Sequence, residues 1–246
     1  MSNVQQEQAV LIKIFHEVPD KNLANLAMIL LICISCVLLV VTVITKSWFM
    51  LILPITGFLI AGGYAFRIAM ISDPSIKNIG GMYMLLIVPA LLLALANYEC
   101  IGKITDAKLI PIIFIIIDIL CLLLQIYGAT TLTSTNVNTI HTGLNFILAG
   151  LLLAIIVNIF FIFILFKVQK NTNFPREFWI CLYVTMILLL TRNVYKSIEF
   201  IQSRMTSDGQ GYIATHEIYM YLFDFSTIFV SLVIFTVLHY GFYLKS

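Results

Sequence analysis

Several polar side chains that could bind a ligand or carry a charge lie inside long apolar runs of this 246-residue sequence. Asp118 lies in the middle of the run 110–131, and Gln125 follows seven residues later on the same face of a helix. A charged side chain at the centre of a bilayer costs about 2.5–3.5 kcal/mol on insertion scales. We therefore expect both side chains to face protein or a watery cavity, where a carboxylate can bind a cationic group.

Two other apolar runs each carry a triplet of polar residues. Both triplets have the i, i+4, i+7 spacing of one helix face: Arg192, Lys196 and Glu199 in the first, and Glu217, Tyr221 and Asp224 in the second. One interpretation is that these charges form ion pairs that hold helices in register, with Arg192 on Asp224 or Asp118. The other is that they line a polar cavity for a ligand headgroup. The two interpretations are compatible if an ion pair opens when the ligand binds.

The composition places these residues in a membrane protein. Apolar residues make up 61% of the chain and charged residues 11%, and the mean hydropathy is +1.03. A soluble protein has about 25% charged residues, so this chain has too few polar groups to cover a water-exposed surface. The apolar runs are continuous rather than alternating, which favours a helix bundle over a β-barrel.

The sequence predicts an all-α, polytopic membrane protein with a bundle of seven transmembrane helices. A crossing needs about 20 apolar residues. Seven segments qualify: 23–45, 48–66, 81–101, 110–131, 143–166, 178–200 and 217–243. Residues 1–246 then form a single membrane domain, because the connecting segments leave no room for a soluble one.

The distribution of basic residues predicts the orientation in the membrane. One side of the predicted bundle carries Lys46, Lys103, Lys108, Lys167, Lys170, Arg176 and Lys245. The other side carries Lys13, Lys21, Arg67, Lys77 and Arg204. Seven basic residues against five place the first side in the cytosol. We therefore expect an extracellular N-terminal tail at 1–22, a cytosolic C-terminus and, since no retention signal ends the chain, the plasma membrane.

Several function classes lack their sequence signatures. The net charge of +2 argues against nucleic-acid binding, which needs a clustered basic face. A phosphate-binding loop, an H-E-x-x-H spacing and a G-x-S-x-G nucleophile motif are absent. We expect no enzyme activity, no cofactor and no metal site. A membrane hydrolase with an interfacial His/Glu/Asp zinc site stays a minor alternative, because His141 and His216 are expected on the same side of the membrane.

Five segments, in order, resemble the fungal RTA-like family, also called lipid-translocating exporters. They are Val18–Asn22, Gly63–Arg67, Pro89–Lys103, Asp118–Gly128, and the stretch from Thr191 to Asp224 with Gly-Gln-Gly at 209–211. Positions matching the family's polar pattern are Arg67, Asp118, Gln125, Arg192, Glu199, Glu217, Tyr221 and Asp224, and its structural motif would include Tyr64, Arg67 and Tyr98. An uncharged 59–62 stretch and His239-Tyr-Gly241 depart from that pattern.

The resemblance implies seven helices and the export or flipping of amphipathic lipids such as sphingoid long-chain bases. These bases carry one ammonium group, so Asp118, Glu217 and Asp224 are the expected contacts of the amine. The other residues expected in the binding site are Gln125, Arg192, Glu199 and Tyr221. Membrane lipids are then the expected partners; protein partners are not predicted. A receptor-like lipid sensor without transport activity is the main alternative, because seven helices with an outside N-terminus suit both functions.

Overall fold

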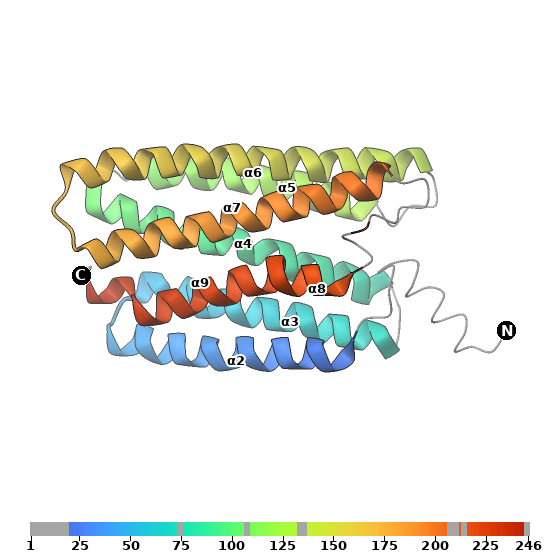
Figure 1. The fold of residues 1–246 in the computed structure, drawn as a ribbon, viewed down its shortest axis with the longest axis horizontal. Coiled ribbons are helices and arrows are strands. Elements are labelled where there is room, and N and C mark those ends of the chain that lie inside the picture. The colour runs from blue at the N-terminus through green and yellow to red at the C-terminus, as the bar shows by residue number, and fades with distance from the viewer. Residues whose placement is uncertain are drawn as a thin grey trace.

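In the part of the chain that the structure describes, seven helices are long and apolar enough to cross a membrane. The computed structural model describes residues 20–72, 76–105, 109–131, 137–205, 212 and 216–243, and no strand occurs among them. The first six spans are α2 (Lys21–Ile44), α3 (Ile52–Ser72, after the 3-10 turn Trp48–Leu51), α4 (Ile76–Thr105), α5 (Leu109–Thr131), α6 (Val137–Asn171) and α7 (Arg176–Met205) (Figure 1). The prediction of an all-α bundle of seven spans is confirmed.

The seventh span is not a single α-helix. It consists of α8 (Glu217–Met220), a π-helical turn η2 (Tyr221–Phe225), α9 (Ser226–Val237) and the 3-10 turn η3 (Tyr240–Phe242). A π turn holds more residues per turn than an α-helix, and such turns are frequent at functional sites.

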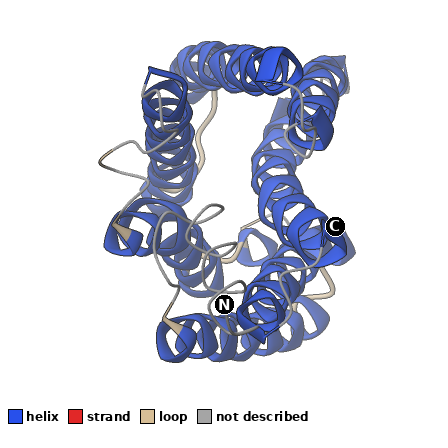
Figure 2. Cartoon of the chain, turned by 90° about the vertical axis from the view of Figure 1, so that its right-hand side faces the viewer, coloured by secondary structure: helices blue, strands red, loops and turns tan. Residues whose placement is uncertain are grey.

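The spans pack as a ring, in which each helix contacts the next one along the chain. Contacts of α9 with α7 and with α2 close the ring, and α4 touches α7 across it. Figure 2, turned by 90° from Figure 1, shows the helices arranged around this ring. Side chains that point inward therefore meet residues from several spans, which satisfies the requirement that intramembrane polar groups face protein.

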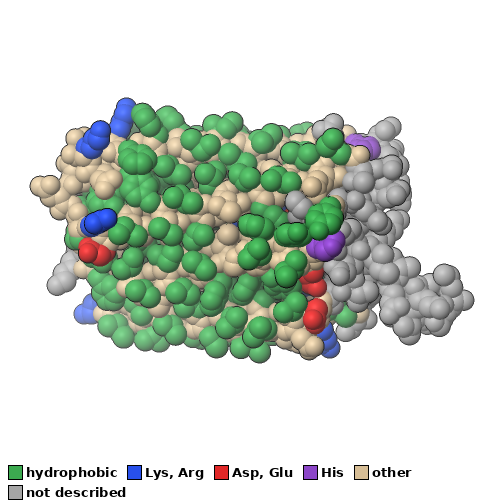
Figure 3. Space-filling view, in the orientation of Figure 1, with side chains coloured by type: hydrophobic (Ala, Val, Ile, Leu, Met, Phe, Trp, Pro, Cys, Tyr) green, Lys and Arg blue, Asp and Glu red, His purple; other side chains and the backbone are tan. Residues whose placement is uncertain are grey.

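The outer surface of the bundle is apolar over its middle. Ile116 and Ile156, on α5 and α6, are 61% and 62% exposed, as a hydrocarbon environment allows. Figure 3 shows hydrophobic side chains over the central part of one face, with charged side chains mostly toward its two ends. The basic side chains gather mainly at the end where the C-terminus lies in Figure 1.

Helix α3 differs from its predicted bounds in a way that bears on the site. The predicted second span ends at residue 66, whereas α3 continues to Ser72. Arg67 is therefore a buried helical residue, 5% exposed, and counting it among the loop charges was wrong. The helix continues past Arg67 because Glu217 of the last span forms an ion pair with it. Residues 1–19, most of the predicted N-terminal tail, lie outside the described part of the chain.

Candidate functional site

An ion pair joins α7 to the π turn inside the bundle. Arg192 Nε lies 2.6 Å from Asp224 Oδ1, and both residues are 4% exposed. Lys196 Nζ lies 3.1 Å from the other carboxylate oxygen, Oδ2, and 2.9 Å from Glu199 Oε2. The carboxylate of Asp224 is thus held by two cations, and its charge is compensated within the protein.

A second ion pair joins α3 to the start of the last span. Arg67 Nη2 lies 2.7 Å from Glu217 Oε1, and Arg67 Nη1 donates to the sulfur of Met220 at 3.2 Å. The other oxygen of Glu217 accepts a hydrogen bond from the backbone N–H of Asp20 at 2.8 Å. Glu217 therefore connects the beginnings of two spans, α2 and α8, to α3.

The π turn gives the last span a different register from the one predicted. On a continuous α-helix, Glu217, Tyr221 and Asp224 would share one face. Across the π turn, Glu217 contacts α3, whereas Asp224 contacts α7. The Tyr221 ring stacks on Tyr64 of α3, with ring centroids 6.1 Å apart. The turn thus lets one short segment anchor two different helices.

Arg192 also contacts the backbone of α4. Its Nη2 donates to the carbonyl oxygen of Leu86 at 2.9 Å. Pro89 lies one turn further along the same helix, and a proline inside a helix disturbs the hydrogen bonding of the preceding turn. The guanidinium of Arg192 therefore connects α4, α7 and the π turn beside this proline.

Asp118 has a different environment from the other intramembrane carboxylates. Its Oδ2 accepts a hydrogen bond from the hydroxyl of Tyr98 at 2.8 Å, and the residue is 8% exposed. Within the described parts of the chain, Asp118 forms no ion pair. It is thus a buried carboxylate that a hydroxyl orients but that no basic side chain of these segments neutralises.

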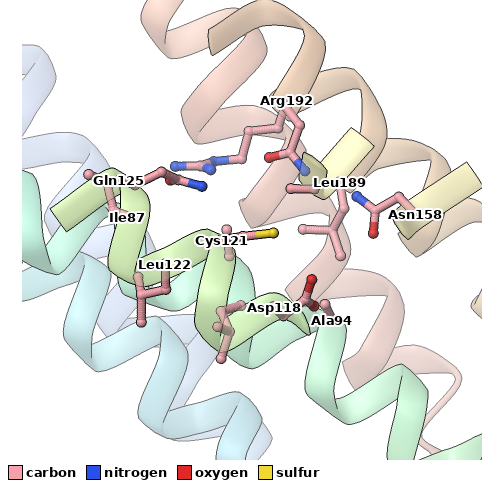
Figure 4. Close-up of a pocket in the computed structure, with 13 residues that line it drawn as sticks. Ile87, Ala94, Asp118, Cys121, Leu122, Gln125, Asn158, Leu189 and Arg192 are labelled. Atoms are coloured by element: carbon pink, nitrogen blue, oxygen red, sulfur yellow. The ribbon is translucent and has the colours of Figure 1, made fainter. Parts of the chain in front are cut away.

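Asp118 lines a cavity inside the bundle, which we call the interior cavity. Its volume is about 40 Å³, enough for roughly three water-sized groups. The walls come from α4, α5, α6 and α7: Ile87, Ala90, Leu91, Ala94, Asp118, Cys121, Leu122, Gln125, Ala154, Asn158, Leu189, Arg192 and Asn193. Figure 4 shows Asp118, Asn158 and Arg192 reaching this space from three helices. The cavity is small, with polar side chains from α5, α6 and α7 and an apolar wall from α4, which suits a small polar group and not a hydrocarbon chain.

Comparisons with known proteins identify the family. The sequence profile described as RTA1 like protein matches residues 53–246. Protein RTA1 of Saccharomyces cerevisiae is 32% identical over 199 residues, which cover 71% of this chain and 60% of that protein. This chain belongs to the RTA1-like family. The aligned region spans less than two thirds of the yeast relative's length, and no solved structure matches the chain.

In this RTA1-like protein the predicted site residues fall into two groups. Asp118, Gln125 and Arg192 line the interior cavity. The remaining predicted contacts lie outside its lining: Glu199, Glu217, Tyr221 and Asp224. Arg192 is the link between the groups, because it lines the cavity and binds Asp224. The roles of all these residues in binding stay predictions.

Sequence reasoning missed two amide side chains of the cavity. Asn158 on α6 and Asn193 on α7 are buried and line it together with Gln125. Asn158 is an isolated amide in the apolar run 143–166, so the rule that found Asp118 could also have found it. Asn193 directly follows Arg192, and the spacing argument in that run considered only the charged residues. Among the described residues no three His, Cys, Asp or Glu side chains gather, and the absence of a metal stays a prediction.

Proposed function

We propose that this RTA1-like protein binds amphipathic lipids with a cationic headgroup, such as sphingoid long-chain bases, and moves them across the membrane. The observation that supports this proposal most is the buried Asp118 carboxylate, which faces a cavity and forms no ion pair within the described segments. A buried charge without a partner is costly, and an ammonium group bound in the cavity would remove that cost.

The rest of the cavity suits the same ligand. Gln125, Asn158 and Asn193 offer amide groups to the hydroxyl and amine of a polar head. Of the three carboxylates expected to bind the amine, Asp224 and Glu217 already have basic partners. The structure therefore favours Asp118 as the first contact, and Asp224 would take part only if the Arg192 ion pair opened.

The proposal includes the orientation of the protein in the membrane. The connections after α2, α4 and α6 lie at one end of the bundle, because successive spans alternate in direction. Lys46, Lys103, Lys167 and Arg176 lie in or beside these connections. We propose that this end is cytosolic, that the N-terminus is outside, and that the protein resides in the plasma membrane.

Transport by purified protein in liposomes tests the proposal. A fluorescent long-chain base should cross liposomes that contain the wild type, and Asp118→Asn should slow this movement at least about tenfold, as loss of a charged hydrogen-bond partner predicts. Glu99→Gln on α4 is the matched control: it also neutralises a carboxylate of a predicted span, but one outside the cavity lining and outside the predicted site, and transport should stay near the wild-type rate.

Two results would contradict this proposal. Equal transport by Asp118→Asn and wild type would show that the carboxylate does not bind the headgroup. Absence of transport in the wild type, together with lipid binding that Asp118→Asn weakens, would favour a receptor-like sensor instead, because a transporter needs no cytosolic partner in liposomes.

A further inference from the structure

A groove on the outside of the bundle separates α2 from the last span. Residues 23–30 of α2 form one wall, and residues 218–226 of α8, η2 and α9 form the other. Its volume is about 320 Å³, against about 40 Å³ for the interior cavity. The two hollows share no lining residue, so the groove is a separate feature of the molecule.

Contacts between α2 and the last span flank the groove. At one end the backbone N–H of Asp20 donates to Glu217 Oε2 and ties the start of α2 to the start of α8. Further along the chain α2 packs against α9, and Leu31 and Leu38 of α2 are completely buried. The lining residues of α2 run from 23 to 30, over which a helix rises roughly 10 Å.

The walls are apolar and face the surroundings of the protein. Leu26 and Leu222 on opposite walls are both 55% exposed, and Ile218 is 68% exposed. Both walls belong to helices apolar enough to span a membrane, so the medium outside the groove is lipid. Another transmembrane helix would pack best against small residues, but the walls have mainly large side chains and only Ala27 and Ser226 are small.

We propose that this groove binds one hydrocarbon chain of a membrane lipid, with the polar end of that lipid beside Asp20 and Glu217. Spans α2 and α8 begin at this end, at Lys21 and Glu217, which is where the membrane interface and its headgroups lie. A flexible chain fits between large aliphatic walls without the close backbone approach that a helix needs. This inference goes beyond transport, because the groove would hold a lipid even if the interior cavity moved none.

Photo-crosslinking in nanodiscs tests the groove without measuring transport. The nanodiscs contain phosphatidylcholine with a diazirine in one acyl chain, and adducts are mapped by mass spectrometry. Peptides spanning 21–30 and 217–226 should carry several-fold more adduct than residues 109–123, whose outward face on α5 is equally exposed to lipid.

Two variants and one control make the test specific. Leu26→Trp and Leu222→Trp each place an indole ring in the groove from an exposed wall position, and each should lower the adduct several-fold because the ring occupies the space of the hydrocarbon chain. Val40→Trp changes a residue that is 56% exposed on the same helix α2 but outside the groove. It should leave the adduct unchanged.

Two outcomes would overturn the proposal. Adduct yields that match those of α5 would mean that the groove holds only ordinary boundary lipid. Yields that both tryptophan variants leave unchanged would place the adduct elsewhere. Both are independent of the liposome assay, so this proposal and the proposed function can fail separately.

Discussion

Replacing Arg192 by glutamine should lower the free energy of unfolding by about 3 kcal/mol, the lower end of the range for breaking a buried ion pair, because Lys196 still contacts Asp224. The side chains of Arg192 and Asp224 are each 5% exposed, so water cannot compensate for the lost charge. The same substitution weakens the contact with the carbonyl of Leu86 beside the Pro89 turn. The expected readout is the fraction of monodisperse protein after heating in detergent.

A double variant separates the ion pair from the general loss of a side chain. Arg192→Gln combined with Asp224→Asn leaves no buried charge at this position, and Lys196 keeps its contact with Glu199. Most of the lost stability should therefore return. Lys196→Gln is the control: its side chain is 19% exposed and Asp224 keeps Arg192, so the loss should be about 1 kcal/mol. A double variant as unstable as Arg192→Gln alone would show that the pair does not set stability.

The sequence was sufficient for the seven spans because their signal is local. Long apolar runs identify transmembrane helices without knowledge of their neighbours. The end of α3 was predicted too early, at residue 66, because the charge of Arg67 marked the end of the apolar run. Its charge is tolerated there only because Glu217, from the last span, lies 2.7 Å away. No local pattern carries that information.

The sequence predicted which polar residues belong to the site, but it did not predict how they are arranged around it. The spacing of Asp118 and Gln125 placed both on one face of α5, and both line the interior cavity. The same reasoning put Glu217 and Asp224 on one face, whereas the two carboxylates bind different helices, α3 and α7, around a π turn. A π turn has no reliable sequence signature, and the three basic residues that hold this segment lie on other helices. Which of Asp118, Glu217 and Asp224 lacks an ion pair among the described residues therefore required the structure.

The shape of the interior cavity depends on how closely α5 and α6 approach. A Cβ atom added to Gly128 would lie 2.5 Å from the carbonyl oxygen of Gly143 and 2.9 Å from the backbone nitrogen of Ile147. Both are backbone atoms of α6, which cannot rotate away as a side chain can. Close helix contacts through small residues are typical of membrane bundles. Gln125 lies one turn before Gly128 and lines the cavity, so a shift of α5 here would also move a cavity wall.

Gly128→Ala should therefore destabilise the protein by about 3 kcal/mol, the upper part of the range for overpacking, and lower the melting temperature by roughly 6–12 °C. Gly62→Ala on α3 is the matched control. Its added Cβ would meet only the terminal methyl of Leu85, at 3.2 Å, and alanine is a better helix former than glycine by up to about 1 kcal/mol. This variant should be as stable as the wild type or slightly more stable.

Thermal unfolding of the two variants in the same detergent measures the difference, and the liposome assay adds a second readout. If α5 moves away from α6, Gly128→Ala should transport a long-chain base more slowly than Gly62→Ala even below its melting temperature, because Asp118 and Gln125 would no longer face Asn158 at the same separation. Equal melting temperatures for the two alanine variants would show that α5 and α6 can separate without cost, and the close packing at Gly128 would then not hold the cavity in shape.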